Sequence, residues 1–145
     1  MRLFLATSFS GQTTPDGKVH ESFRRDVEAI INGLLNAGHS VFCAVQAEGW
    51  DVNTLRPEQA FEMDLRELNE ADAFIGFVTA NPPSAGVQFE IGYSLAKGKR
   101  VVLMRHESDK LPYMNIGLVN SGNAIELQYE SMDDLVQQLK SELSR

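Results

Sequence analysis

The sequence predicts one α/β domain with a five-stranded, mainly parallel sheet and helices on both faces. Short apolar runs alternate along the chain with longer segments of helical periodicity, which is the pattern of β–α repeats around a parallel sheet. The 145 residues are enough for one compact domain and too few for two ordinary ones. No repeat or low-complexity tract divides the span 1–145.

Five apolar runs are expected to be the strands. They are "RLFLAT" at 2–7, "SVFCAV" at 40–45, "AFIGFV" at 73–78, "RVVLM" at 100–104 and "AIEL" at 124–127. Runs this short and this apolar are typical of strands that are covered on both faces. Cys43 is the single cysteine, so it forms no internal disulfide or thiolate zinc site. We expect it to be a buried apolar residue rather than a nucleophile.

Helices are expected at about 21–37, 57–70, 86–97 and 131 onward, with a short turn or helix near 113–120. In the first helix the apolar positions recur at helical spacing, at Phe23, Val27, Ile30, Ile31, Leu34 and Leu35, and Gly38 ends it. Pro57 suits the first turn of the second helix. Its predicted buried stripe is Phe61, Leu65 and Leu68, with Asp64 at the edge. Leu135, Val136 and Leu139 should face inward in the last helix.

The charge and hydropathy of the chain exclude several classes of partner. A formal net charge of -7 disfavours duplex nucleic acid and anionic membranes, because basic residues drive both associations. The apolar runs are far shorter than the roughly 20 residues that span a bilayer. No secretory signal precedes the first strand, so a cytoplasmic location is expected.

In a parallel α/β sheet, ligands bind beyond the carboxyl ends of the strands. Four strand-to-helix connections lie there: "TSFSGQ" at 7–12, "AEGWD" at 47–51, "NPPSAG" at 81–86 and "RHESDKLPYMN" at 105–115. Ser84 and Gly86 precede a helix, where free N–H groups and the helix dipole favour an anion. Ser84 is equally explained as a helix cap without any ligand.

Two carboxylates are candidates for the chemistry at this edge. Glu90 lies about one turn into the third helix, where the dipole should favour its ionised form, and Asp64 lies on the preceding helix. Two carboxylates in different environments are what glycosidic cleavage uses. The alternative for each is a solvated surface acid.

The third helix has two apolar faces. Val87, Ile91 and Leu95 are spaced to pack on the sheet, and Phe89, Tyr93 and Ala96 form a second strip. A monomer would leave that strip exposed, so a homodimer is expected.

Loop residues add further candidates. Ser8 has a hydroxyl for a phosphate or sugar, and Phe9 is either a base-stacking ring or a core residue. Trp50 either covers the ligand or anchors its own loop, and anchoring is favoured. The histidines His20, His39 and His106 show no metal-type spacing, although His106 borders the expected site.

Three segments together resemble a known family. "LFLATSF", "EMDLRELNEADAFIGFV" and "PSAGVQFEIGYSLAKGKRVVLM" are similar to the nucleoside 2-deoxyribosyltransferase-like superfamily over residues 3 to about 127. The closest resemblance is to its nucleoside 5′-monophosphate N-glycosidases, which include deoxynucleotide hydrolases and CMP or hydroxymethyl-CMP hydrolases. The most specific element is "FEIG", preceded by "SAG" and followed by "GK". The resemblance implies a Rossmann-like (flavodoxin-like) domain.

The resemblance also implies roles for individual residues. Glu90 matches the family's nucleophile, and Asp64 matches the residue that contacts the base or protonates it. Ser84 and Gly86 match the 5′-phosphate site, and Ser8 and Phe9 match first-loop contacts to phosphate and base. The implied reaction releases a free base from a nucleotide through a glycosyl ester, without a metal or redox cofactor. A deoxyribosyltransferase and a non-catalytic nucleotide-binding domain remain the alternatives.

Overall fold

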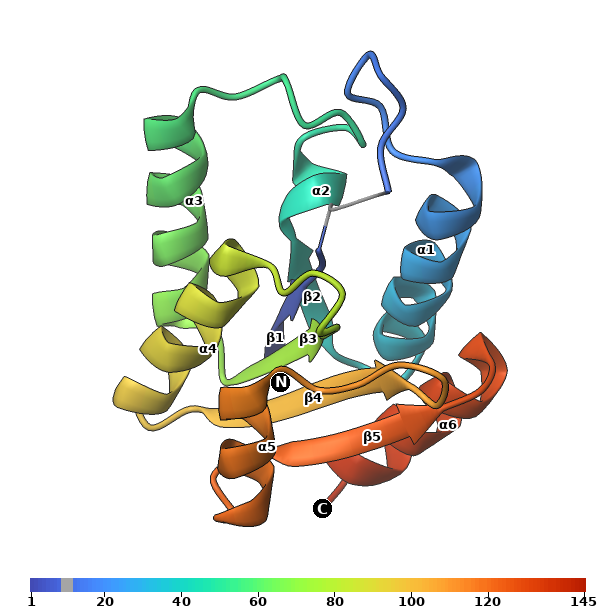
Figure 1. The fold of residues 1–145 in the computed structure, drawn as a ribbon, viewed down its shortest axis with the longest axis vertical. Helices are drawn as coiled ribbons and strands as arrows, with labels where there is room; N and C mark the ends of the chain where they lie inside the picture. Colours follow the sequence, from blue (N-terminus) through green and yellow to red (C-terminus); the bar gives the residue numbers. More distant parts are fainter. Residues whose placement is uncertain (9–11) are drawn as a thin grey trace.

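The computed structural model describes residues 1–8 and 12–145, and it confirms the α/β architecture (Figure 1). The elements are β1 (Arg2–Ala6), α1 (Glu21–Asn36), β2 (Ser40–Cys43), α2 (Ala44–Ala47), α3 (Pro57–Glu70), β3 (Ala73–Phe77), α4 (Ala85–Ala96), β4 (Arg100–His106), α5 (Tyr113–Asn120), β5 (Ile125–Tyr129) and α6 (Met132–Leu143). All strand pairs are parallel, in the order β2-β1-β3-β4-β5. Their carboxyl ends therefore share one edge of the sheet.

The sheet separates two hydrophobic cores. Alternate residues of a strand point to opposite faces, so Leu5 and Ile75 pack beneath α1 and α6, whereas Phe4 and Phe74 pack beneath α3 and α4. In Figure 1, α1 and α6 lie on the right of the sheet and α3 and α4 on the left. Side chains at the carboxyl edge therefore belong to one of two distinct environments.

The predicted element boundaries lie within two residues of the observed ones, and the difference with most structural consequence is at the second strand. A strand was expected over 40–45, but the chain leaves the sheet after Cys43 and forms the short helix α2. Val45 is still fully buried. A short apolar run does not by itself distinguish a strand from a buried helical turn, which explains the error.

Two predicted core residues are instead on the surface. Phe61 is 52% exposed and Leu35 is 49% exposed. The Phe61 ring lies 6.0 Å from the ring of Phe89, which is itself 49% exposed, and Phe61 is not part of the core cluster beneath α3 and α4. Leu35 lies in the last turn of α1 beside the exposed Asn36. Periodicity identifies the apolar side of a helix but not how far the sheet covers it.

The helices in the described ranges are also short. The longest, α1, has 16 residues. Within 1–8 and 12–145, no helix has both the length and the apolar character that a bilayer crossing requires.

Candidate active site

The start of α4 combines a capped turn with open space. Ser84 is the N-cap, and its Oγ accepts a hydrogen bond of 3.2 Å from the Val87 N–H. Capping is therefore observed, while the hydroxyl proton of Ser84 is still available to donate. Gly86 is exposed, and an added Cβ would meet only the Ser84 Oγ, at 3.9 Å. The backbone at this turn is thus accessible to a ligand.

Glu90 lies on the second turn of α4 and is only partly exposed. Its pKa is raised from the ordinary 4.5 to about 8, first by burial and then by the charge of Asp64. The expectation of an ionised Glu90 near the start of the helix is therefore wrong. The dipole acts mainly within the first turn of a helix, and Glu90 lies beyond it, where desolvation of the charge dominates.

Asp64 is the other member of this carboxylate pair. It projects from the middle of α3, and its Oδ1 is enclosed without a hydrogen-bond partner among the described residues. Burial raises its pKa to about 6. At neutral pH the pair therefore holds mainly one proton, with Glu90 protonated and Asp64 ionised. An enclosed acceptor without a partner is costly for folding, so it marks a position suited to a ligand.

The charges of this carboxylate pair also affect the pKa values of two residues near the end of β2. Cys43 is 2% exposed, and burial, together with the charges of Asp64 and Glu90, raises its thiol pKa to about 11. The prediction that Cys43 is buried is confirmed, and a raised thiol pKa disfavours the nucleophilic thiolate. Glu48, just after α2, has its pKa raised by burial and by the charge of Asp64. No local signal in the sequence indicates Glu48, because its raised pKa depends on burial and on Asp64, which lies on another helix.

The loop candidates Ser8, Phe9 and Trp50 have different outcomes in the structure. The Ser8 Oγ is enclosed and lacks a hydrogen-bond partner among the residues described. Phe9 lies outside the described residues. Trp50 is 9% exposed in the core beneath α1, and the Arg24 guanidinium lies 5.1 Å from the centre of its ring. The backbone N–H of Trp50 donates to the Val45 carbonyl (2.8 Å). This placement favours the loop-anchoring interpretation of Trp50 over substrate binding.

A buried amide pair joins the candidate catalytic helix to α5. Gln88 and Asn115 exchange two hydrogen bonds, each of 2.9 Å, and Asn115 is 1% exposed. Gln88 immediately precedes Phe89 and Glu90 on α4. The pair therefore fixes α4 against the 105–115 segment. No local pattern in the sequence could have indicated it, since the two residues are 27 positions apart.

Comparisons with known proteins identify the family of the chain. The family model described as nucleoside 2-deoxyribosyltransferase matches residues 19–138. A protein of Thermofilum pendens, named a candidate 2′-deoxynucleoside 5′-phosphate N-hydrolase 1, is 29% identical over 147 aligned positions, which cover 99% of this chain and 95% of the relative.

Several solved structures have the same fold as this chain. The Clostridium botulinum CMP N-glycosidase BcmB superposes with a TM-score of 0.72 at 27% identity, covering 96% of this chain and 98% of that protein. BlsM superposes with a TM-score of 0.80 at 25% identity, covering 97% and 87%. The Bacillus psychrosaccharolyticus 2-deoxyribosyltransferase shares the fold, with a TM-score of 0.65 at 22% identity over 94% and 90%. Because the family model covers most of the sequence, the chain belongs to the nucleoside 2-deoxyribosyltransferase family of enzymes.

Proposed function

We propose that the protein hydrolyses the N-glycosidic bond of a nucleoside 5′-monophosphate and releases the free base and a ribose or deoxyribose 5-phosphate. The observation that carries the proposal is the carboxylate pair, in which Glu90 and Asp64 have raised but different pKa values. Glycosidic cleavage needs such a pair, because one group attacks and the other transfers a proton. The names of two relatives, an N-hydrolase of deoxynucleotides and a CMP N-glycosidase, support the same reaction.

The start of α4 suits the 5′-phosphate of the substrate. The Ser84 hydroxyl can donate to a phosphate oxygen, and the accessible backbone at Gly86 allows close approach. N–H groups in the first turn of a helix attract anions. A phosphate bound there would direct the sugar along α4, which brings C1′ toward Glu90. Ser8 is the first-loop candidate for a further contact.

The proton on the pair suggests how the reaction begins. In the resting pair the proton is mainly on Glu90. Its transfer to Asp64 makes Glu90 a carboxylate and Asp64 an acid. Glu90 then attacks C1′ through an oxocarbenium-like transition state, the bond from C1′ to the base nitrogen breaks, and Asp64 donates the proton to the departing base.

The second half of the reaction regenerates the enzyme. The first half leaves a glycosyl ester on Glu90 and an ionised Asp64. Asp64 accepts a proton from water as the water oxygen attacks C1′, and the ester bond to Glu90 breaks. The sugar phosphate leaves with retained configuration, because two displacements have occurred. The pair again holds one proton.

Transfer to a second base is the alternative outcome of the same intermediate. The matching family model and one structural neighbour bear the name deoxyribosyltransferase. A base that enters in place of water would attack C1′ and form a new glycosidic bond. A non-catalytic nucleotide-binding domain is the third alternative, and it predicts binding without cleavage.

We also propose that the protein is a homodimer. Large apolar side chains on α3, α4 and α5 are exposed: Phe61, Phe89, Tyr113, Met114 and Ile116. The Phe61 and Phe89 rings lie 6.0 Å apart, and the Gln88–Asn115 pair joins α4 to α5, so these side chains belong to adjoining helices. Exposed apolar surface of this kind marks an interface. Sedimentation analysis of Met114→Glu should show a monomer, whereas the wild type should sediment as a dimer.

One experiment tests the reaction. The purified protein is incubated with ribo- and deoxyribonucleoside 5′-monophosphates and with the matching nucleosides, and free bases are separated by chromatography. We expect base release from monophosphates, and its loss in Glu90→Ala. Glu62→Gln removes an exposed carboxylate of the same helix as Asp64 and should retain activity.

The alternatives give different results in the same assay. Formation of a new nucleoside when a second base is added would establish transfer. Intact nucleotide after long incubation, with a raised melting temperature, would overturn the proposed hydrolysis in favour of a binding domain.

A further inference from the structure

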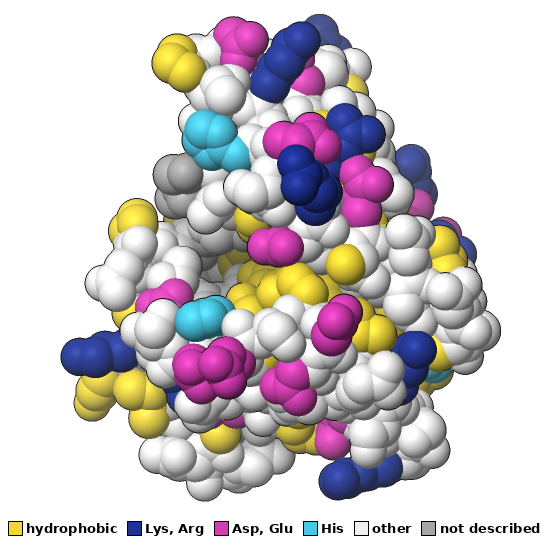
Figure 2. All heavy atoms as spheres, turned by 90° about the vertical axis from the view of Figure 1, so that its right-hand side faces the viewer, with side chains coloured by type: hydrophobic (Ala, Val, Ile, Leu, Met, Phe, Trp, Pro, Cys, Tyr) yellow, Lys and Arg dark blue, Asp and Glu magenta, His cyan; other side chains and the backbone are white. Residues whose placement is uncertain are grey.

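A cavity at the carboxyl edge of the sheet is separate from the carboxylate pair. Its volume is about 580 Å³, and neither Glu90 nor Asp64 lines it. Its aromatic residues Phe23, Phe77 and Tyr129 pack with the core beneath α1 and α6, whereas the pair projects from α3 and α4 on the other face. Figure 2 looks onto the α1 and α6 side and shows a hollow with hydrophobic side chains inside it.

Aromatic rings form one wall of the cavity. His106 and Tyr129 are partners in the β4–β5 register, and their rings meet edge to face with centroids 5.4 Å apart. The Phe77 ring lies 6.1 Å from that of Tyr129. Ser108 fixes the imidazole, because its Oγ lies 2.7 Å from the His106 Nδ1. The wall is therefore an ordered apolar surface.

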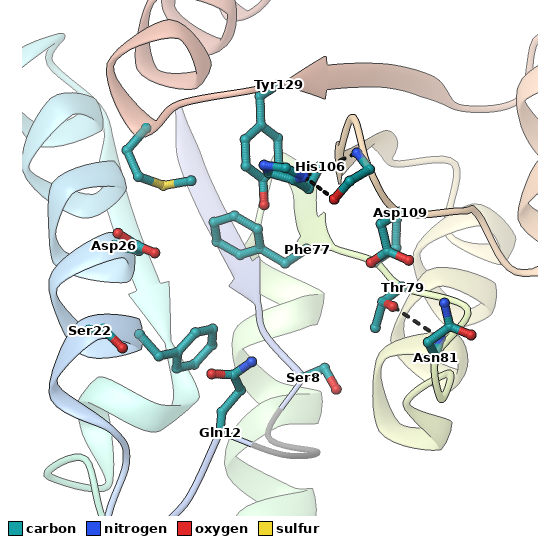
Figure 3. Close-up of a pocket in the computed structure, with 14 residues that line it drawn as sticks. Ser8, Gln12, Ser22, Asp26, Phe77, Thr79, Asn81, His106, Asp109 and Tyr129 are labelled. Atoms are coloured by element: carbon teal, nitrogen blue, oxygen red, sulfur yellow. Dashed lines mark hydrogen bonds between the residues drawn. The ribbon is translucent and has the colours of Figure 1, made fainter.

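Two carboxylates approach this wall from different elements. Asp26 comes from α1 and Asp109 from the connection after β4, and in Figure 3 they lie on opposite sides of Phe77. Both are close enough to Tyr129 for their charges to raise the pKa of its hydroxyl, which burial and these charges bring to about 12. Neither carboxylate forms a salt bridge within the described ranges.

The charges and rings together select the class of ligand. No lysine or arginine is found among the described residues that line the cavity, so a phosphate would be repelled by Asp26 and Asp109. A cation would be attracted, both by the carboxylates and by the faces of the rings. The residues described contain no group of three metal-type ligands, so the expected cation is organic. The enclosed Ser8 Oγ also lines the cavity, so the cavity meets the proposed nucleotide site at the first loop.

We propose that this cavity binds a small aliphatic diamine. One ammonium group pairs with Asp26 and the other with Asp109, while the hydrocarbon stem lies along Phe77 and Tyr129. The volume is within the range of roughly 300–1,000 Å³ that is usual for small-molecule sites. The cavity adjoins the proposed nucleotide site at Ser8 but is lined by neither Glu90 nor Asp64, and the proposal does not rest on the glycosidic reaction.

Isothermal titration calorimetry with putrescine tests the proposal directly. We expect one saturable site for putrescine and none for 1,4-butanediol, which has the same stem without charge. Asp26→Asn and Asp109→Asn should each weaken binding about fivefold or more, since each removes one ion pair. Glu62→Gln is the matched control, because it removes an equal charge from the exposed side of α3 and should leave binding unchanged.

Melting curves of all variants establish that they are folded before binding is compared. Two independent aspartates are tested so that failure of one variant to fold leaves the other informative. Absence of saturable putrescine binding would overturn the proposal. Equal binding of 1,4-butanediol, or wild-type affinity for putrescine in both aspartate variants, would also overturn it. The same holds if Glu62→Gln weakens putrescine binding as much as the aspartate variants do, because putrescine would then be attracted only by the net negative charge of the protein.

Discussion

The charge of Asp64 on α3 adds to burial in raising the pKa of Glu90 on α4, so the two carboxyl groups titrate as a pair. The two carboxyl groups come from different helices, α3 and α4, which are separated in the sequence by strand β3. The lower member has a pKa of about 6 and the higher about 8. Between these values the pair holds mainly one proton, which is the form that the proposed reaction requires.

The first prediction concerns the pH dependence of activity. The kcat/KM for a nucleoside 5′-monophosphate should be greatest between about pH 6 and pH 8. Below this range Asp64 is already protonated and accepts no proton from Glu90, and above it the pair has no proton for the departing base. Rates measured from pH 5 to 9.5 test this. In Asp64→Asn the rise near pH 6 should be absent, and a flat wild-type profile would contradict the proposed proton transfer.

The second prediction concerns the stability of Glu90→Gln. Folded Glu90 keeps its proton up to about pH 8, whereas the unfolded group loses it near 4.5. The folded state therefore binds more protons between these values, and stability falls as pH rises through them. The substitution removes this loss, so the free energy of unfolding should exceed that of the wild type above pH 8, by on the order of 2–4 kcal/mol.

Urea denaturation at pH 5 and pH 9 measures this difference for both proteins. The gain should shrink as the pH approaches 4.5, because the wild-type carboxyl is then neutral in both states. The variant should have no hydrolase activity at any pH. Equal stability at pH 9 would show that Glu90 is not buried in solution as it is in the structure.

The third prediction separates binding from stability at Gly86. Alanine at this exposed helical position should stabilise the protein by roughly 0.5–1 kcal/mol, because it reduces the backbone freedom of the unfolded chain. The added Cβ enters the space proposed for the phosphate. We expect KM for the monophosphate to rise about tenfold, with little change for the corresponding nucleoside.

Gly92→Ala is the control for this prediction. Gly92 lies on the same helix, and its added Cβ would meet nothing within 4 Å. It should stabilise the protein similarly without changing KM. An unchanged KM in Gly86→Ala would place the phosphate elsewhere.

The fourth prediction concerns the amide pair between α4 and α5. Asn115→Ala leaves the Gln88 side chain without its two partners in a buried site. The free energy of unfolding should fall by about 1–3 kcal/mol, as measured by urea denaturation. Asn120→Ala, at an exposed position of the same helix, should change it by less than about 0.5 kcal/mol. Similar small losses in both variants would argue against the pair.

Much of the fold was predictable because its signals are local. The bounds of α3 were predicted as 57–70 and are observed there, since Pro57 marks its start and its apolar spacing is regular. The end of β2 was not predicted, because the same apolar residues suit a strand or a buried helical turn. Phe61 was misplaced because helical spacing marks the apolar side of α3 but does not show which residues of that side are covered in the folded chain.

The candidate site was predictable in part for the same reason. Ser84 was identified from helix-start chemistry and is observed as the N-cap. The assignment of Glu90 and Asp64 came from the motif, and their catalytic roles stay predictions. Their protonation was not predictable, because it depends on burial and on a neighbour from another helix. Glu48 and the Gln88–Asn115 pair likewise depend on contacts formed only in the folded chain.

Because the sheet separates the two cores, mutations on its two faces should have different effects. A truncation such as Ile30→Ala, beneath α1, removes packing behind the sheet and does not touch the helices that bear Glu90 and Asp64. In a cell, this substitution should lower the number of folded molecules without changing the catalytic rate of each one. Substitutions beneath α3 and α4 should change both the number of folded molecules and the catalytic rate of each one. Sequence drift is therefore expected to be freer behind the sheet, where a lost methyl group is tolerated as long as enough protein folds.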